Sequence, residues 1–158
     1  VVEESIVDGP GLRYVLFTQG CPHACRGCHN PETHSLFGGR LVSVSSVLAA
    51  VEKNPLLAGV TFSGGEPFLQ PEPLCALARG VHALGGTVVV YTGYTLEQLR
   101  ELADPPSRRL LLAADLLVDG PYVEALRDLN LPFRGSSNQR LLGPGEIRSA
   151  LAGEPAPV

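Results

Sequence analysis

Three cysteines lie close together in this chain, and their spacing indicates a metal centre. Cys21, Cys25 and Cys28 follow the pattern C-x₃-C-x₂-C, with no fourth cysteine nearby. Cubane iron–sulfur clusters are normally held by four thiolates, so three thiolates leave one iron without a protein ligand. A small molecule can bind such an iron directly. The spacing therefore predicts a [4Fe-4S] cluster with one open coordination position.

An open iron of this kind favours a chelating ligand. The amine and carboxylate of an amino acid form a five-membered chelate, and S-adenosylmethionine carries both groups beside a sulfonium centre. One electron passed from a reduced cluster into the sulfonium can break its bond to the ribose C5′. The product is a 5′-deoxyadenosyl radical, which abstracts unactivated hydrogen. Because the cofactors carry this chemistry and the protein orients them, no catalytic side chain is expected.

Two other interpretations of the cysteine loop are open. A structural zinc ion could be held by the three cysteines and one histidine, with His23 or His34 as the fourth ligand. The residues 25–29 also match the C-x-x-C-H pattern of c-type haem attachment. Neither interpretation explains why glycine-rich turns follow the other expected strands.

Composition places the chain among globular domains. With 158 residues, of which 44% are hydrophobic, we expect a single domain over residues 1–152 and a flexible tail over 153–158. The formal net charge of −4 argues against general binding to nucleic acid, and no apolar run reaches membrane-spanning length. The absence of an export signal favours a cytoplasmic location with reduced thiols. The isolated Cys75 lies in a helical pattern and is expected in the core.

Strands and helices alternate along the sequence. Strands are expected at residues 12–18, 59–62, 87–91 and 116–118, with one more within 133–142. Helices are expected from Ser43 to before Pro55, along 74–84, from a capping box at 95–98, and briefly after 121.

This alternation implies an α/β fold with a parallel sheet and right-handed crossovers. The chain is too short for a full eight-unit barrel, so we expect an incomplete TIM-type β/α barrel with parallel strands and about four to six β/α units.

The unusual motifs each follow directly after an expected strand. They are the cysteine loop, Ser63-Gly64-Gly65-Glu66-Pro67, Thr92-Gly93-Tyr94, and Asp119. In β/α architectures the carboxyl ends of parallel strands share one face, where ligands bind. The four motifs are therefore expected to converge on one site.

These residues also suit the parts of S-adenosylmethionine. Gly64 and Gly65 allow close approach of the backbone, and their carbonyl groups can accept hydrogen bonds from the ammonium group. Glu66 adds negative charge beside it. Thr92 could bind the ribose or the methionyl carboxylate, and Asp119 could bind ribose hydroxyls or a cation. Thr-Gly and Asp-Gly also occur in ordinary turns.

Taken together, the motifs resemble those of the radical S-adenosylmethionine superfamily, and within it the activating enzymes of glycyl-radical proteins. The resemblance covers about residues 5–142. It rests on the cysteine spacing with the Ser63–Pro67 motif, and on the segments 8–13, 20–21, 28–30, 91–94, 117–120 and 133–140. In one respect the chain departs from much of the superfamily, because Gly27 replaces the aromatic residue that precedes the third cysteine and stacks on adenine.

The resemblance implies an oxygen-sensitive oxidoreductase that installs a radical on a glycine of a partner enzyme. Cys21, Cys25 and Cys28 would hold the [4Fe-4S] cluster. The residues that would border S-adenosylmethionine are Gly27, Cys28, His29, Gly64, Gly65 and Glu66.

The expected partners are the large subunit of anaerobic ribonucleoside-triphosphate reductase, through its C-terminal glycine region, and a one-electron donor such as a flavodoxin. Neither nucleic acid nor a membrane is expected as a partner. One alternative is activation of another glycyl-radical enzyme such as pyruvate formate-lyase. An alternative from a different class is a non-catalytic zinc-binding interaction module.

Overall fold

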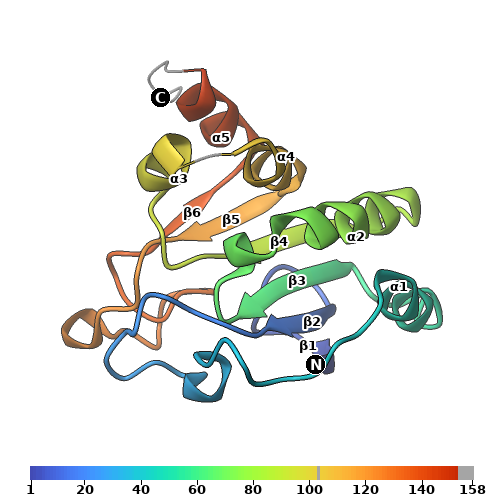
Figure 1. Ribbon diagram of the computed structural model, residues 1–158, viewed down its shortest axis with the longest axis horizontal. Helices are drawn as coiled ribbons and strands as arrows, with labels where there is room; N and C mark the ends of the chain where they lie inside the picture. Colours follow the sequence, from blue (N-terminus) through green and yellow to red (C-terminus); the bar gives the residue numbers. More distant parts are fainter. Residues whose placement is uncertain (103, 153–158) are drawn as a thin grey trace.

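The computed structural model describes residues 1–102 and 104–152, which form an α/β fold around one six-stranded mixed sheet (Figure 1). The strands lie side by side in the order of the sequence: β1 (Val2–Ser5), β2 (Arg13–Thr18), β3 (Gly59–Gly64), β4 (Thr87–Tyr91), β5 (Leu116–Asp119) and β6 (Arg140–Leu142). The expected tail at 153–158 lies outside the described residues.

The four central strands run parallel, as predicted, but the two edge strands do not. β2, β3, β4 and β5 pair in parallel, whereas β1 is antiparallel to β2 and β6 is antiparallel to β5. The prediction of an entirely parallel sheet is therefore wrong at both edges. A parallel connection needs a crossover of about a dozen residues or more, usually a helix. Residues 6–12 are too few, and residues 120–139 hold only the short 3₁₀ helix η3 (Glu124–Leu126).

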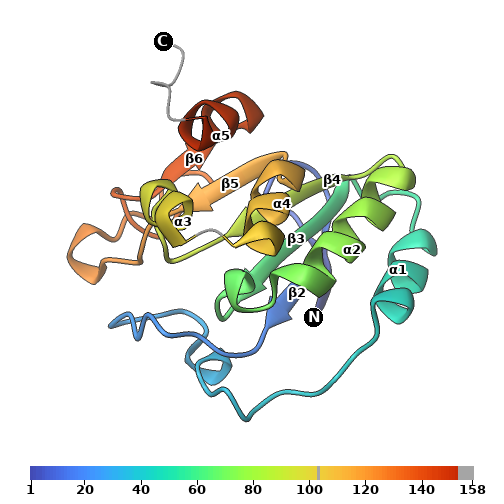
Figure 2. The ribbon, with the colours of Figure 1, turned by 45° about the horizontal axis from the view of Figure 1, so that its top comes forward.

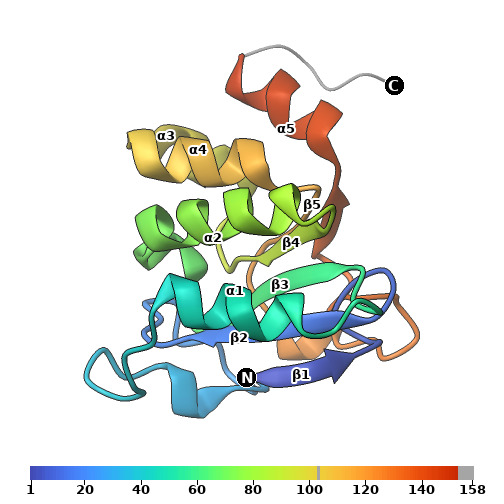
Figure 3. The same ribbon diagram turned by 90° about the vertical axis from the view of Figure 1, so that its right-hand side faces the viewer.

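Helices connect the parallel strands and pack on one face of the sheet (Figures 2 and 3). They are α1 (Val44–Glu52), α2 (Pro71–Ala83), α3 (Leu96–Leu102) and α4 (Pro105–Ala113), and α5 (Pro144–Leu151) follows β6. Ser43 caps α1 as expected, because its hydroxyl accepts a hydrogen bond from the backbone N–H of Ser46. The expected capping box at α3 is also confirmed: Thr95 and Gln98 each accept a bond from the other's backbone N–H.

Side chains alternate between the two faces along the central strands. One set, which includes Val60, Phe62, Val88, Val90 and Leu117, packs with the helices in the main hydrophobic core. The intervening residues point to the opposite face, where the loops 6–12 and 120–139 lie. Among the described residues, no helix is long and apolar enough to cross a membrane.

A buried arginine fastens the 6–12 loop to this second face. Arg13 is inaccessible to solvent, which lowers the pKa of its guanidinium group. It donates five hydrogen bonds, to the side chains of Thr61 and Thr87 and to the carbonyl oxygens of Pro10, Val60 and Thr87. Thr61 in turn donates to the carbonyl oxygen of Asp8 at 2.7 Å. The loop is therefore held over the sheet by neutral acceptors around one cation.

Candidate cluster and cofactor site

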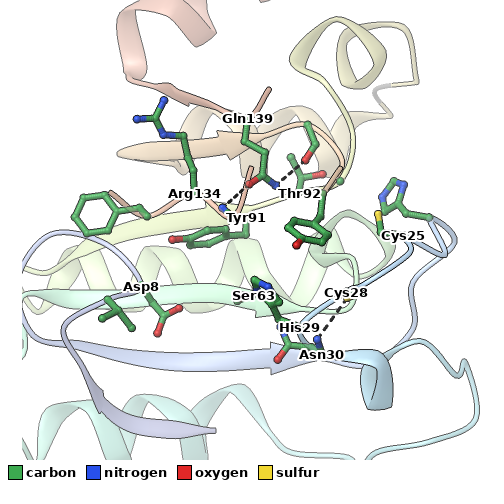
Figure 4. Close-up of a pocket in the computed structure, with 18 of the residues that line it drawn as sticks. Asp8, Cys25, Cys28, His29, Asn30, Ser63, Tyr91, Thr92, Arg134 and Gln139 are labelled. Carbon is green, nitrogen blue, oxygen red and sulfur yellow. Dashed lines mark hydrogen bonds between the residues drawn. The ribbon is translucent and has the colours of Figure 1, made fainter. Parts of the chain in front are cut away.

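A cavity of about 650 Å³ lies on the second face of the sheet, beside the carboxyl ends of the central strands (Figure 4). The three expected thiols line it together. The other expected site residues on its wall are His29, Gly64, Gly65 and Thr92. The cysteine loop and the ends of β3 and β4 therefore converge as predicted. Gly27, Glu66 and Asp119 lie outside the lining.

The cysteine loop presents three free, partly exposed thiols to this cavity. It turns through left-handed backbone just before the second and third cysteines, at Ala24 (φ 49°) and Gly27 (φ 75°). The sulfur of Cys28 accepts a hydrogen bond from the backbone N–H of Asn30 at 3.4 Å, and burial raises the pKa of the Cys21 thiol. Thiolates are the ligands of iron–sulfur clusters, so this donor set fits such a cluster.

A structural zinc ion makes a stricter demand on the placement of its ligands. A structural zinc site needs four ligands converging tetrahedrally on one point. Across residues 1–102 and 104–152, no three His, Cys, Asp or Glu side chains are placed to hold a single ion. Both histidines considered as a fourth ligand line the cavity, and Nε2 of His23 is hydrogen-bonded to Glu66. The thiolates of a cubane cluster bind different irons and need no common point.

The Gly-Gly-Glu turn is joined to the base of the cysteine loop by backbone hydrogen bonds. The N–H of Gly65 donates to the carbonyl oxygen of Thr18 at 2.8 Å, and the N–H of Glu66 donates to that of Gly20 at 2.7 Å. Gly64 has a φ of 88°, which favours glycine. The backbone of Gly65 and Glu66 thus holds one cavity wall against the loop that carries the thiols.

The Glu66 carboxylate does not face the cavity, although the sequence suggested a role beside the ammonium group. Glu66 is fully buried and accepts hydrogen bonds from four groups of the chain: His23 Nε2, Thr92 Oγ1, and the backbone N–H groups of Phe68 and Gly93. Thr92 lines the cavity, but its hydroxyl is directed to this carboxylate. The negative charge therefore serves contacts within the chain.

Asp119 is likewise engaged inside the protein. It is 1% exposed, accepts a hydrogen bond from the N–H of Leu96 at 2.8 Å and forms an ion pair with Arg140. Arg140 also pairs with Glu97 at 2.7 Å, and this hydrogen bonding lowers the pKa of Glu97. The network joins β5, β6 and α3. On the cavity wall the neighbouring Gly120 takes the place expected for Asp119.

Gly27 and His29 differ in their relation to the cavity, because His29 lines it and Gly27 does not. Gly27 faces Glu124, whose side chain a Cβ at position 27 would meet at 3.0 Å. The His29 ring lies on the cavity wall, 4.9 Å from the ring of Tyr122 with an angle of 49° between the planes. Of the two residues, only His29 is placed to contact a molecule in the cavity.

Sequence reasoning missed much of the remaining wall. These residues are Ile6, Val7, Asp8, Tyr91, Tyr122, Arg134 and Gln139. A signal was present for Tyr91, which is a polar aromatic residue at the end of an otherwise aliphatic strand. Burial raises the pKa of its phenol, and the charge of Asp8 adds to the shift.

The 133–140 segment, recognised by resemblance, forms part of this wall by folding on itself. The side-chain oxygen of Gln139 accepts hydrogen bonds from the N–H groups of Gly135 and Ser136. Its nitrogen donates to the carbonyl oxygen of Gly120. One glutamine therefore holds both ends of the loop that closes the cavity.

Comparison with known proteins agrees with this site. The model of a family described as a 4Fe-4S single cluster domain matches residues 7–142, the span that holds the cysteine loop and the strand ends around the cavity. The thiol-lined cavity thus lies in a domain of the single-cluster 4Fe-4S class.

Relatives narrow the assignment further. The anaerobic ribonucleoside-triphosphate reductase-activating protein of Vibrio cholerae is 34% identical over 143 residues, covering 85% of this chain and 89% of that protein. The proteins of the same name from Salmonella typhi and Enterobacteria phage T4 are 36% and 35% identical, each over 85% of this chain and over 90% and 86% of their own lengths. The chain belongs to the family of anaerobic ribonucleoside-triphosphate reductase-activating proteins.

Proposed function

We propose that this protein is a radical S-adenosylmethionine activating enzyme that generates a glycyl radical on anaerobic ribonucleoside-triphosphate reductase. The observation that carries the proposal is that Cys21, Cys25 and Cys28 line one cavity together with Gly64, the last residue of β3, and Gly65, which follows it. The names of the relatives support the reductase as partner. The C-terminal glycine region of its large subunit would be the part that this protein contacts. Residues 1–152 would form one domain, in which the open sheet corresponds to an incomplete β/α barrel.

The two cofactors supply the chemistry when bound: one electron from a donor such as a flavodoxin cleaves the sulfonium C–S bond reductively, which yields methionine and, after hydrogen abstraction from the glycine, 5′-deoxyadenosine. The chain contributes binding and orientation. The thiolates of Cys21, Cys25 and Cys28 would hold the [4Fe-4S] cluster, which would leave one of its four irons without a protein ligand. A glycine suits the abstraction because no side chain blocks approach and flanking peptide groups delocalise the radical.

Five of the expected cofactor contacts remain in this proposal: Cys28, His29, Gly64, Gly65 and Thr92, all of which line the cavity. The carbonyl groups of the two glycines can accept hydrogen bonds from an ammonium group. We assign Gly27, Glu66 and Asp119 to support of the wall, because none of the three lines the cavity, while Glu66 is hydrogen-bonded to Thr92 and Asp119 is paired with Arg140.

Anaerobic reconstitution with iron and sulfide tests the proposal. The wild-type protein should form 5′-deoxyadenosine from S-adenosylmethionine under reduction, and Cys25→Ala should not. Cys75→Ala is the matched control, because Cys75 is buried in the core as predicted and its thiol donates to the carbonyl oxygen of Pro106. Cys75→Ala should therefore keep the activity. Full turnover by Cys25→Ala would contradict the proposal.

Incubation with candidate partners identifies the target enzyme. We expect the electron paramagnetic resonance doublet of a glycyl radical with anaerobic ribonucleoside-triphosphate reductase and none with pyruvate formate-lyase. Metal analysis of anaerobically purified protein separates both from an interaction module. One tightly held zinc ion without iron would favour the module.

A further inference from the structure

His23 lies between the first two cysteines, and its ring fits a space formed by residues outside the loop. Its Nε2 lies 2.5 Å from Oε1 of Glu66. Its ring meets the ring of Tyr94 edge-on, with centroids 4.4 Å apart and planes at 77°. A Cβ at position 93 would lie 2.4 Å from the His23 ring, so the imidazole occupies the space that a side chain on Gly93 would need. The turn after β4 is therefore shaped around this histidine.

Glu66 gives the histidine a fixed partner. A buried carboxylate is costly unless hydrogen bonds and a counter-charge compensate for lost hydration. Oε1 accepts hydrogen bonds from Thr92 Oγ1 at 2.7 Å and Gly93 N–H at 2.9 Å, and Oε2 accepts one from Phe68 N–H at 3.1 Å. These donors follow β3 and β4. The carboxylate is thus attached to two strand ends, and His23 connects the cysteine loop to it.

The loop has little other attachment to the sheet through its side chains. Within residues 21–28, all of them described, Arg26 forms an ion pair with Glu124 at 3.7 Å, but these side chains are 95% and 55% exposed. Exposed pairs of this kind contribute little. The backbone bonds of the loop join Cys21 to His34 and Cys28 to Cys25. The contact between His23, whose side chain is 14% exposed, and the fully buried Glu66 is therefore better shielded from solvent than the Arg26–Glu124 pair, and it links the loop to the strand ends.

We propose that His23 and Glu66 are positioning residues for the cluster: together they hold the Cys21–Cys25 part of the loop so that its thiols face the cavity. This inference rests on the proposed cluster function. It assigns to Glu66 the role of anchoring the loop in place of binding the ammonium group of S-adenosylmethionine. Groups that orient metal ligands are typically worth about 10–100-fold in metal affinity or activity.

Two substitutions of matched polarity and different length test the link. In His23→Gln the side-chain amide reaches about as far as Nε2 and can still donate to Glu66. In His23→Asn the amide is too short. After reconstitution, the Asn variant should lose iron to a chelator at least about tenfold faster than wild type, with an altered resonance spectrum of the reduced cluster. The Gln variant should recover wild-type behaviour on both measurements. Equal iron loss and spectra for wild type, Gln and Asn variants would overturn the inference.

Two further variants test the partners of His23. Gly93→Ala keeps both His23 and Glu66 but fills the space of the ring, so it should behave like His23→Asn. Glu66→Gln should also speed iron loss. If Glu66→Gln instead weakens binding of S-adenosylmethionine with wild-type iron retention, Glu66 binds the cofactor and the inference is wrong.

Measurement of the wild-type protein distinguishes a failure of the proposed cluster function from a failure of the positioning role of His23. A wild-type protein that takes up no iron and sulfide contradicts the proposed function itself. A wild-type protein that holds the cluster, with His23→Asn and Gly93→Ala equal to it, contradicts only the positioning role. Circular dichroism of the metal-free variants checks that they fold, and the reaction of their thiols with a thiol reagent should be faster in His23→Asn than in His23→Gln.

Discussion

A Cβ atom at position 65 would lie 2.3 Å from the carbonyl oxygen of Gly20. The turn after β3 therefore packs directly on the backbone that leads into the cysteine loop. Backbone atoms cannot move aside as a flexible side chain can. The second glycine of the Gly-Gly-Glu motif is thus required by packing within the protein, in addition to any approach of a cofactor.

Replacement of this glycine should damage both stability and cluster binding. We expect Gly65→Ala to lower the free energy of unfolding by about 1–3 kcal/mol, the usual cost of overpacking, and to reduce iron uptake. Urea denaturation of the metal-free protein measures the first effect. Gly145→Ala is the control, because a Cβ there meets no atom within 4 Å and lies in α5. The helix should gain up to about 1 kcal/mol. Equal stability of Gly65→Ala and wild type would contradict the packing argument.

Arg13 should be among the residues most sensitive to substitution. Arg13→Met removes five hydrogen bonds and leaves buried carbonyl oxygens of Val60 and Thr87 without this donor. Each unsatisfied buried group costs about 1–3 kcal/mol, so a loss of about 2–4 kcal/mol is expected in urea denaturation. Arg108→Met, at an exposed position of α4, should change the stability by less than about 0.5 kcal/mol. Similar losses for both variants would show that the buried network adds nothing.

Arg140 should contribute more to the stability of the protein than its partial exposure suggests. Its removal leaves the Asp119 carboxylate, 1% exposed, with the hydrogen bond from Leu96 as its one partner among the residues that the structure describes. We expect Arg140→Gln to cost about 1.5–3 kcal/mol, the range for hydrogen bonds to charged groups. Glu97→Gln should cost less, because the Glu97 side chain is 64% exposed and such pairs are weak. Denaturation of both variants and of the double variant measures their coupling. A neutral Arg140→Gln would contradict the assigned role of Asp119.

The ion pair between Arg140 and Glu97 predicts that the stability of the protein depends on pH. The hydrogen bond from Arg140 lowers the pKa of Glu97 below its ordinary value of 4.5. The unfolded chain therefore takes up this proton at a higher pH than the folded protein does. The contribution of Glu97 is complete above about pH 4.5 and is lost as the pH falls through the lowered folded value. The free energy of unfolding, measured from pH 6 to pH 3, should therefore fall less steeply in Arg140→Gln than in wild type. Identical slopes for the two proteins would contradict this prediction.

The central strands and their helices were predictable from sequence because they bury regular apolar patterns. The strand expected at 87–91 has these bounds in the structure. The strand expected at 59–62 extends two residues further, to Gly64, and the strand expected at 116–118 extends one residue further, to Asp119. β1 carried no such pattern, since three of its four residues are exposed. α4 was missed because it begins with Pro105-Pro106, which resembles a loop, although Asp104 caps it. α5 begins in the turn-like sequence Gly-Pro-Gly.

The site was predictable only where residues follow parallel strands directly. The carboxyl ends of parallel strands meet on one edge of a sheet, and this rule correctly predicted that the three cysteines, Gly64, Gly65 and Thr92 lie together. It could not show which way each side chain turns. Glu66 and Asp119 lie at the expected edge, yet each carboxylate is directed to partners within the protein. Residues such as Ile6 and Arg134 reach the cavity from loops whose course depends on tertiary contacts.

The open coordination position of the cluster is the central claim, and double resonance spectroscopy tests it most directly. The reduced, reconstituted protein is mixed with S-adenosylmethionine that carries ¹⁵N in its amine and ¹³C in its methionyl carboxylate. We expect magnetic coupling between both labels and the cluster, because the amino acid group chelates the iron that lacks a cysteine. Absence of coupling, or a fourth protein ligand already bound to that iron, would contradict the account.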